Sequence, residues 1–310
     1  MIDQPLLKTV QALIAQEALP QSYVNTVEQT ILPLAEYVID LRRNRQGPVI
    51  VGLHGAQGTG KSTLVLFLKR LLQEHFHCRT ASLSLDDLYL TRAEREQLAD
   101  RVHPLLVTRG VPGTHDVDLG QQVVDRLLVA KKDECVSLPA FDKATDDRQP
   151  EDRWPVFDGP ADVVLLEGWC LGAVPVEDAG ELANPVNALE LAEDPDGVWR
   201  EYVNECLRSR YRVFFDRIDV LIMLKAPSME CVLEWRTLQE HKLAARHGGA
   251  PKEGEAAKPV RIMSDDEVAR FIMHYERITR RCLAEMPSRA DAVIDVAEDH
   301  CLGRPVFKKR

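Results

Sequence analysis

The sequence lacks the features that mark membrane, secreted and metal-stapled proteins. No stretch approaches the ~20 consecutive apolar residues that a membrane helix needs. The N-terminal segment carries Asp3 and Glu17 and has no long apolar run, which argues against a signal peptide. The cysteines number seven and form no C-x-x-C pair, so neither a disulfide framework nor a zinc site is indicated. We therefore expect a cytoplasmic protein with reduced thiols.

The chain also lacks an excess of positive charge. The chain has 39 Lys and Arg residues against 49 Asp and Glu residues, which gives a formal net charge of −10. Such a chain has no general attraction to nucleic acid or to an anionic membrane, and we expect neither as a partner. Hydrophobic residues make up 45% of its 310 residues, enough for a globular core. If the protein handles anions, its positive charge must be concentrated in a cleft.

One motif carries most of the functional information. Residues 55–62 read G-x-x-x-x-G-K-S, the pattern of the phosphate-binding P-loop. A mostly apolar run precedes them and a segment with helical spacing follows, which is the strand–loop–helix context that the motif needs. Its glycines let backbone N–H groups turn toward phosphate oxygens, and the helix N-terminus adds its positive dipole end. The motif predicts a nucleoside triphosphate site, in which Lys61 reaches the β/γ-phosphates and Ser62 ligates Mg²⁺. The predicted nucleotide-binding residues are Gly55, Ala56, Gln57, Gly58, Thr59, Gly60, Lys61, Ser62 and Thr63.

The order of strand and helix patterns predicts an α/β fold with a mainly parallel sheet flanked by helices. Residues 1–47 are expected to form a helical extension of two amphipathic helices, and residues 48–310 the P-loop domain. Stretches 139–160 and 170–197 are rich in Asp, Pro or Gly and are predicted to be irregular. Strands are expected near 48–54, 79–85, 134–138, 162–167, 219–224 and 291–296, and helices near 61–76, 91–101, 117–131, 198–212, 228–246 and 264–286.

Two acidic strand ends are candidates for catalysis. An apolar run over 163–166 ends in Glu167, where a carboxylate can hold Mg²⁺ or orient the attacking group. Asp86 and Asp87 close another predicted strand, where one of them could accept the proton of an acceptor hydroxyl. The spacing does not say which of the two acts. Without the P-loop, Glu167 could equally be an ordinary acidic strand end.

Three other segments offer charged groups. In the loop over 141–153, which includes Lys143, most of the charges are expected to be solvated. The turn over 109–116 presents Arg109, His115 and Asp116, which could meet an anionic acceptor, although Asp116 is also a good helix cap. Arg236, Lys242 and Arg246 lie on the predicted helix before a glycine-rich stretch. That arrangement would suit a lid at about 235–262, although a charged helical face is more often simply solvated.

The chain resembles the D-glycerate 3-kinase family, within the superfamily of phosphoribulokinase, uridine kinase and pantothenate kinase. The resemblance covers about residues 48–300. It is carried, after the P-loop, by Ser-Leu-Asp-Asp-Leu-Tyr at 84–89, Arg-Gly-Val-Pro-Gly-Thr-His-Asp at 109–116, Leu-Pro-Ala-Phe-Asp-Lys at 138–143 and Glu-Gly-Trp-Cys-Leu-Gly at 167–172. Plant and fungal members usually have Gly-x-Gly-Asp-Arg after the Phe-Asp-Lys element. Here residues 148–153 stand instead and keep only Asp152 and Arg153.

The resemblance implies an ATP- and Mg²⁺-dependent kinase of a small alcohol, with D-glycerate as the leading acceptor and 3-phosphoglycerate as the product. It implies Asp86 as the base, Glu167 near the metal and Arg236 in the lid; the catalytic set is then Lys61, Asp86 and Glu167. The acceptor side would include Arg109, His115, Asp116 and Arg153. Alternatives are a kinase of a nucleoside, a pantothenate-like alcohol or a sugar, and a regulatory P-loop nucleotide-binding protein. A GTPase would need an Asn/Thr-Lys-x-Asp element, which the sequence lacks.

Overall fold

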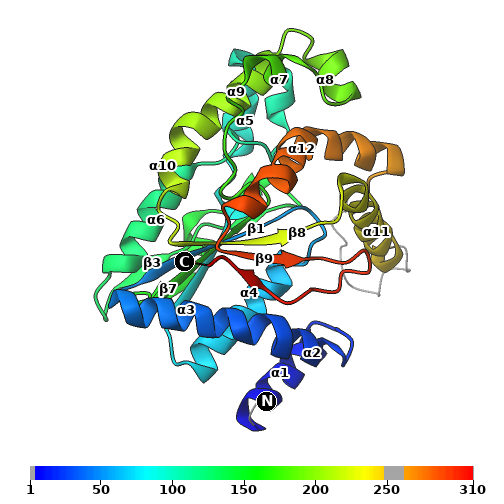
Figure 1. Ribbon diagram of the computed structural model, residues 1–310. Helices are drawn as coiled ribbons and strands as arrows, with labels where there is room; N and C mark the ends of the chain where they lie inside the picture. The colour runs from blue at the N-terminus through cyan, green and yellow to red at the C-terminus, as the bar shows by residue number, and fades with distance from the viewer. Residues whose placement is uncertain (1–3, 248–261, 310) are drawn as a thin grey trace, which may run out of the picture.

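A six-stranded sheet forms the centre of the protein. The computed structural model describes residues 4–247 and 262–309. The sheet has the strand order β10-β9-β8-β1-β7-β2, in which β10 is antiparallel to β9 and the other pairs are parallel (Figure 1). The predicted parallel α/β architecture is therefore confirmed. Its strands are β1 (Val49–Gly55), β2 (Thr80–Ser84), β7 (Val163–Gly168), β8 (Val220–Lys225), β9 (Ala292–Asp295) and β10 (Val306–Phe307).

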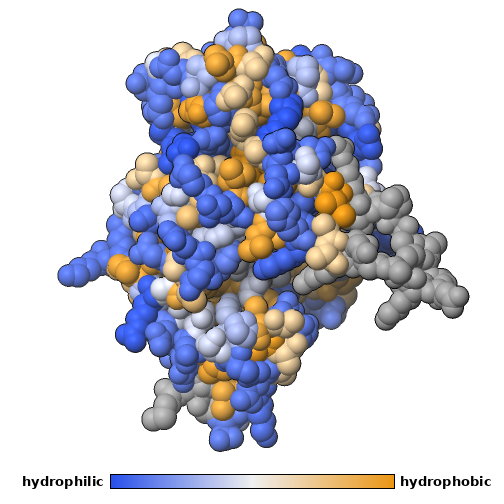
Figure 2. Space-filling model, turned by 90° about the vertical axis from the view of Figure 1, so that its right-hand side faces the viewer, coloured by the Kyte–Doolittle hydropathy of each residue, from blue (hydrophilic) through white to orange (hydrophobic). Residues whose placement is uncertain are grey.

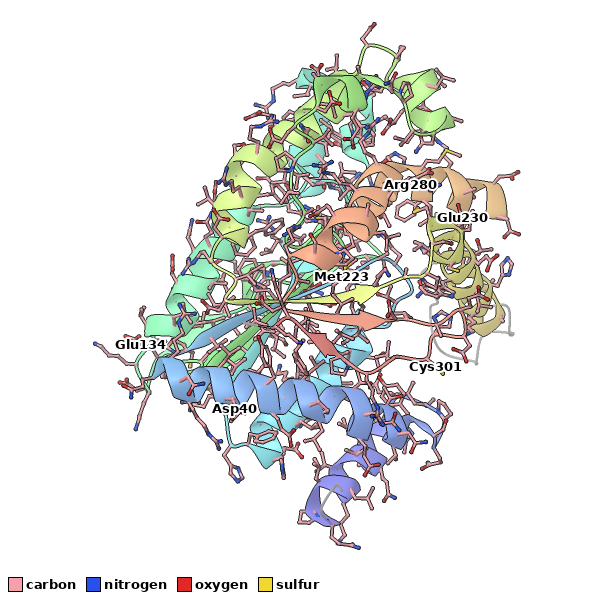
Figure 3. The ribbon with its side chains drawn as sticks, in the orientation of Figure 1. Asp40, Glu134, Met223, Glu230, Arg280 and Cys301 are labelled. Carbon is pink, nitrogen blue, oxygen red and sulfur yellow. The ribbon has the colours of Figure 1, made fainter. Side chains whose placement is uncertain are left out.

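Side chains of the buried strands alternate between two hydrophobic layers. In β1, Ile50 contributes to one layer, whereas Val49 and Val51 contribute to the other. Met223 of β8 belongs to the same layer as Ile50, on the side of the sheet covered by α12 (Figure 3). Because both faces are covered, these strands read as almost continuous apolar runs. This explains why the sequence identified β1 and β7 readily.

The helices cover both faces of the sheet and extend beyond one end of it. Helices α6, α9, α10 and α12 lie on one side, and α1, α3 and α4 on the other (Figure 1). Three π-helical turns (Val27–Ile31, Leu71–His75 and Leu207–Tyr211) continue into or out of neighbouring α-helices. The helices are α1 (Gln4–Gln16), α2 (Tyr23–Thr26), α3 (Leu32–Arg45), α4 (Lys61–Arg70), α5 (Arg92–Arg101), α6 (Val117–Val129), α7 (Ala179–Ala183), α8 (Ala188–Glu193), α9 (Val198–Cys206), α10 (Arg212–Phe215), α11 (Met229–His247) and α12 (Asp265–Glu285).

The N-terminal helices share a hydrophobic layer with the sheet. Leu34 and Val38 of α3 are fully buried in the layer that contains Val49 and Val51. The cationic last turn of α3 also contacts the sheet, because Arg42 forms an ion pair of 2.5 Å with Asp162, the residue before β7. Arg45 pairs in the same way with Asp219, the residue before β8. Helix α3 is thus packed onto the sheet, and buried residues of α1 such as Val10 and Ile14 belong to the same hydrophobic layer.

One predicted strand lies outside the main sheet. The expectation near 134–138 was a strand of the parallel sheet, but β3 (Cys135–Ser137) pairs antiparallel with β6 (Val156–Asp158). Only Val136 of β3 is buried, and Cys135 is exposed, so this strand lacks the two-sided burial that a central parallel strand needs. A second small pair, β4 (Phe141–Asp142) and β5 (Asp147–Arg148), forms a hairpin within the stretch that was predicted to be irregular.

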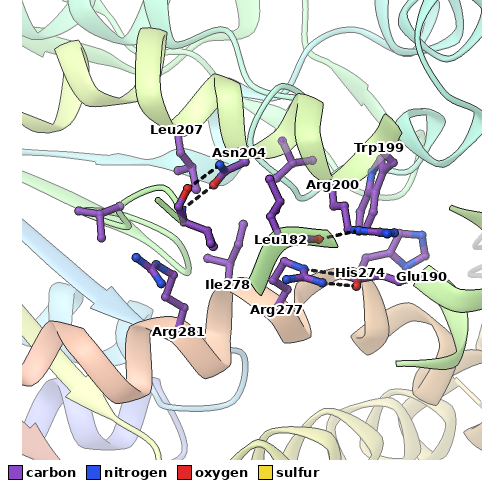
Figure 4. A pocket seen from close by; sticks show the side chains of 13 residues that line it. Leu182, Glu190, Trp199, Arg200, Asn204, Leu207, His274, Arg277, Ile278 and Arg281 are labelled. Carbon is purple, nitrogen blue, oxygen red and sulfur yellow. Dashed lines mark hydrogen bonds and ion pairs between the residues drawn. The ribbon is translucent and has the colours of Figure 1, made fainter. Parts of the chain in front are cut away.

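The predicted irregular stretch 170–197 contains the short helices α7 and α8. Buried ion pairs attach it to the long helices beneath (Figure 4). Arg277 of α12 pairs with Glu190 of α8 at 2.6 Å, and Arg200 of α9 donates to the Leu182 carbonyl at 2.8 Å. Because these bonds satisfy carboxylate and backbone groups away from water, the segment is firmly held although its sequence is rich in turn formers.

The side of the molecule toward which β8 and β9 point, on the right in Figure 1, is mainly hydrophilic. Figure 2 shows this side, where hydrophobic residues lie in small groups among charged and polar ones. Among residues 4–247 and 262–309, no helix combines the length and apolar character that crossing a membrane requires.

Candidate active site

A cleft of about 550 Å³ lies where the carboxyl ends of β1, β7 and β2 meet. Open α/β sheets bind their ligands at this edge. The register of the sheet explains the meeting, because Glu167 lies beside Leu53 of β1 and beside Ser84 of β2. The candidates that line the cleft together include Lys61, Ser62, Asp86, Arg109, Glu167 and Arg236.

The P-loop has the backbone shape that phosphate binding needs. Gly58 and Gly60 have φ values of +82° and +83°, a region that side chains disfavour. Thr59 Oγ1 donates to the Ala56 carbonyl at 2.8 Å, and Lys61 Nζ donates to the same oxygen at 3.1 Å. Burial lowers the pKa of Lys61, while the nearby carboxylates of Glu167 and Asp86 oppose that shift. Lys61 is the first residue of α4, and its side chain is bonded back to the backbone of the P-loop.

Two aromatic side chains support the P-loop from outside. A Cβ atom on Gly58 would lie 2.5 Å from Trp235 Cβ, so the loop and α11 are in direct contact there. The Trp235 indole packs against the His300 ring with centroids 4.7 Å apart. His300 Nδ1 lies 3.0 Å from the Gly58 carbonyl oxygen. No local pattern indicates this contact, because His300 lies 242 positions from Gly58 in the chain.

Ser62 and Glu167 form a pair of hard oxygen donors. Ser62 Oγ donates to Glu167 Oε1 at 3.1 Å, at the start of α4. Among the residues that the structure describes, no three or more His, Cys, Asp or Glu side chains gather into a metal-binding group. Mg²⁺ in phosphate-transfer sites needs no such group, because one or two carboxylates, the phosphates and water complete its shell. The hydroxyl and carboxylate found here fit that pattern.

Asp86 faces the cleft with both carboxylate oxygens engaged. Tyr89 donates its hydroxyl to Asp86 Oδ1 at 3.0 Å, and Lys143 Nζ lies 2.6 Å from Asp86 Oδ2. Burial alone would raise the pKa of Asp86, but the charge and hydrogen bond of Lys143 outweigh it and lower the pKa below 3.8. Asp86 is therefore ionised, in the form that can accept a proton or a hydrogen bond.

Asp87 has a different environment from its neighbour. Its Oδ1 accepts the backbone N–H of Phe141 at 3.2 Å, and it does not belong to the cleft lining. Burial raises the pKa of Asp87 to about 6, which the hydrogen bond from Phe141 partly opposes. The spacing in the sequence did not distinguish these two carboxylates, but their positions in the structure differ. Asp86 lines the cleft, and Asp87 bonds to the β4–β5 hairpin.

Arg109 lines the cleft but already has a carboxylate partner. Its guanidinium forms an ion pair with Asp146 and lies over the Phe141 ring, 5.5 Å from the centroid. Its backbone carbonyl accepts the Tyr275 hydroxyl at 3.1 Å. Gly110 makes this contact possible, since a Cβ atom there would lie 2.2 Å from the Tyr275 hydroxyl. An anionic ligand at Arg109 would either share the guanidinium group with Asp146 or displace Asp146 from it.

The other predicted acceptor residues lie outside the cleft lining. His115 is 2% exposed, packs against the Tyr89 ring with centroids 4.5 Å apart, and has Nδ1 2.6 Å from the Tyr211 hydroxyl. Burial lowers the pKa of His115 to about 3, so the imidazole is neutral. Asp116 accepts the Leu119 N–H at 3.0 Å as the cap of α6, the alternative that its position suggested. Arg153 is exposed in a 3₁₀ turn, Glu151–Arg153.

The predicted lid residues differ in position. Arg236 of α11 lines the cleft and forms an ion pair of 2.7 Å with the buried Glu240. Lys242 is exposed on the same helix. Arg246 lies near the end of α11, and its side chain, like residues 248–261 of the predicted lid, lies outside the described part of the chain.

Sequence reasoning missed several residues of the cleft wall, among them Lys143, Trp169 and Tyr275. Lys143 was grouped with solvated loop charges, although it contacts Asp86. Trp169 donates Nε1–H to the Gly110 carbonyl at 2.9 Å and packs edge-on against Tyr275. The position of Trp169 directly after Glu167 and Gly168 was a usable signal. Tyr275 lies in the middle of an ordinary amphipathic helix and had none.

Comparison with known proteins agrees with this geometry. No protein-family model matches the chain. An uncharacterized kinase of Schizosaccharomyces pombe, mug58, is 35% identical over 236 residues, which are 74% of this chain and 78% of the relative. The chloroplastic D-glycerate 3-kinase of Arabidopsis thaliana is 30% identical over 267 residues, 81% of this chain but 53% of the plant protein. The solved D-glycerate 3-kinase of Cryptococcus neoformans superposes with a TM-score of 0.74 at 26% identity, over 90% of this chain and 99% of that one.

The chain belongs to the D-glycerate 3-kinase family. These relatives confirm the predicted P-loop kinase fold and the predicted enzyme class, an ATP-dependent kinase. The chain spans about half the length of the plant enzyme.

Proposed function

We propose that the protein transfers the γ-phosphoryl group of ATP to D-glycerate and forms 3-phosphoglycerate. The observation that carries the proposal is the meeting of a P-loop, an ionised carboxylate and cationic side chains in one cleft. Asp86 lies there in contact with Lys143, and Lys61 and Arg109 line the same cleft. The names of the plant relative and of the solved fungal structure support glycerate as the acceptor.

In the proposed reaction, the acceptor hydroxyl donates a hydrogen bond to Asp86. The hydroxyl oxygen attacks the γ-phosphorus while the bond from that phosphorus to the bridging oxygen breaks. Asp86 takes the hydroxyl proton, and ADP leaves with the electrons of the broken bond. Lys61 and the P-loop N–H groups bind the phosphate oxygens whose charge is redistributed. Positioning and charge stabilisation supply most of the rate enhancement in such transfers.

Ser62 and Glu167 are the proposed magnesium site. Their contact of 3.1 Å brings a hydroxyl and a carboxylate to the start of α4, next to the expected phosphates. A bound Mg²⁺ would neutralise phosphate charge and help align the phosphoryl group. Arg109 is the proposed partner of the acceptor carboxylate, since a guanidinium can bind a carboxylate with two parallel hydrogen bonds. His115 and Asp116 would act indirectly, by supporting Tyr89 and the turn over 109–116.

The proposed organisation is a helical extension over residues 1–47 and a kinase domain over 48–310. The proposed lid at about 235–262 would bring Arg236 toward the γ-phosphate on closure and exclude water. Its residues 248–261 lie outside the described chain. All seven cysteines are free thiols, which supports a reducing compartment such as the cytoplasm.

The test is to identify the product. Purified protein is incubated with ATP, MgCl₂ and D-glycerate, and the phosphorylated acid is analysed by ³¹P NMR against authentic 2- and 3-phosphoglycerate. The expected result is ATP-dependent appearance of 3-phosphoglycerate, and its loss in the Lys61→Ala variant. Formation of 2-phosphoglycerate would contradict the proposed position of transfer, and absence of any phosphorylated acid would contradict the acceptor.

A further inference from the structure

Lys143 occupies the place that an acceptor should take. Its ammonium group lies 2.6 Å from Asp86 Oδ2, while the Tyr89 hydroxyl lies 3.0 Å from Asp86 Oδ1. An acceptor hydroxyl must come within hydrogen-bond distance of the same carboxylate before it can lose its proton to it. With Lys143 in this position, one oxygen of the proposed base is already covered by a positive charge.

The Lys143 side chain can move while its backbone stays fixed. The side chain is 61% exposed, whereas the side chains of Arg109 and Arg236, two arginines of the cleft lining, are 26% and 19% exposed. Lys143 follows β4, and the β4–β5 hairpin is fixed at its base. Phe141 donates its backbone N–H to Asp87 at 3.2 Å, and Arg148 of β5 donates to the Tyr89 carbonyl at 2.9 Å. A change of rotamer at Lys143 therefore needs no change in the hairpin.

Lys143 also lines two adjoining cavities. It lines the P-loop cleft and the adjoining hollow of about 770 Å³, and Arg109 lines both as well. A small acid bound between these two cations would lie beside Asp86. The charge of the acid would then compete with the Asp86 carboxylate for the ammonium group of Lys143.

We propose that Lys143 selects acceptors that carry a carboxylate, by leaving Asp86 for that carboxylate and so freeing the oxygen that receives the hydroxyl proton. This inference rests on the proposed function. The acceptor class is a short hydroxy acid whose carboxylate lies only a few bonds from the reacting hydroxyl, because one lysine side chain must reach both carboxylates in turn. Lys143 stays protonated throughout, and the hydroxyl proton goes to Asp86.

The test compares an acid with its neutral amide. Initial rates with D-glycerate and with D-glyceramide are measured for the wild type, Lys143→Met and Lys143→Arg. Lys308→Met is the matched control, because Lys308 is an exposed lysine outside the cleft lining. Lys143→Met should raise the KM for D-glycerate by about 10- to 100-fold, the range for losing a hydrogen bond to a charged group. The KM for ATP should stay within about threefold, the rate with the amide should not fall, and Lys143→Arg should recover part of the loss.

A pH profile gives a readout that a merely structural role would not change. On its acid side, kcat/KM reports the free enzyme, in which Lys143 lies on Asp86. Loss of the lysine charge should move that fall-off to higher pH. Lys61 and His115 also face Asp86, as do Tyr89, Tyr275, Cys170 and Asp87, and all of these remain in the variant.

The outcomes separate this inference from the proposed function. If the wild type phosphorylates D-glycerate and Lys143→Met leaves its KM and the pH profile unchanged, the role of Lys143 is wrong and the proposed function stands. An equal loss with acid and amide would also overturn the role, because it would show no selection for the carboxylate. If the wild type accepts no hydroxy acid, both proposals fail.

Discussion

The two halves of the cleft are built in different ways. On the P-loop side, one continuous segment supplies the shape, and Lys61 and Thr59 bond to the carbonyl of Ala56 within that segment. On the proposed acceptor side, side chains from separate segments pair with one another: Lys143 with Asp86, and Arg109 with Asp146. The first half is preformed for phosphate, whereas the second holds its charges in pairs that an incoming ligand must share or break.

This contrast explains why the two halves differ in how far a sequence determines them. A backbone site requires glycines and a following helix at fixed spacing, and these are visible in the sequence. A site of paired side chains depends on which loops meet in space. It follows that substitutions on the two sides should fail differently, through phosphate binding on one side and through acceptor choice on the other.

The largest effect is expected for Asp86→Asn. The substitution keeps the shape of the side chain and its contact with Tyr89 but removes the basic carboxylate. We expect kcat to fall about 10²- to 10⁴-fold, the usual contribution of a general base, with the KM for ATP nearly unchanged. Steady-state kinetics with both substrates varied measures this. A rate within a few-fold of the wild type would mean that Asp86 is not the base.

Lys61→Ala should produce the next largest loss. The lysine bonds to the Ala56 carbonyl, and the core does not depend on it for packing, so the fold should persist. We expect kcat to fall about 10²- to 10³-fold, the scale of removing one preorganised electrostatic contact. Circular dichroism and thermal melting provide the control for folding. Near-normal turnover by the folded variant would refute the P-loop assignment.

Arg109→Lys should affect the acceptor more than the nucleotide. A lysine cannot reproduce two parallel hydrogen bonds to a carboxylate, and it would also weaken the contacts with Asp146 and Phe141. We expect the KM for the acid to rise about tenfold while the KM for ATP stays within a few-fold. Equal increases in both values would move Arg109 to the phosphate side of the cleft.

The smallest effect on catalysis is expected for Asp87→Asn, which should instead change the pH dependence of stability. Burial raises the pKa of Asp87 from 3.8 to about 6, so between these values the folded protein binds more protons than the unfolded chain. The free energy of unfolding therefore contains a contribution that decreases as the pH rises from about 4 to about 6. An asparagine can still accept the Phe141 N–H and does not titrate.

Urea unfolding at several pH values between 4 and 7 measures this difference. The variant should be less sensitive to pH than the wild type across the window, with turnover close to normal. If Asp87→Asn instead abolished turnover while Asp86→Asn did not, the two carboxylates would have to exchange roles.

Much of the fold could be predicted, because its main elements have strong local signals. Buried apolar runs identified β1 and β7, and alternating strand and helix patterns gave the parallel sheet. The assignment of residues 134–138 to that sheet was wrong, since a three-residue strand with one buried side chain pairs equally well in a small two-stranded antiparallel sheet. The short helices α7 and α8 were missed because tertiary ion pairs, such as Arg277 with Glu190, hold them.

The candidate site divides in the same way. The positions of Lys61, Ser62 and Glu167 follow from local patterns and sheet register, and the structure brings them together. The contact between Lys143 and Asp86 joins residues 57 positions apart in the chain, through a hairpin with no strong signal. His115 has the polar character of a ligand residue, but its surroundings bury it behind Tyr89.

An acceptor screen tests the central claim most directly. ADP release is measured with saturating ATP and Mg²⁺ against D-glycerate, L-glycerate, nucleosides, pantothenate and sugars, each at several concentrations. The proposed function predicts the highest kcat/KM with D-glycerate, and much lower values with the neutral nucleosides and sugars. Preferential phosphorylation of a nucleoside or a sugar, with no activity toward D-glycerate, would contradict it.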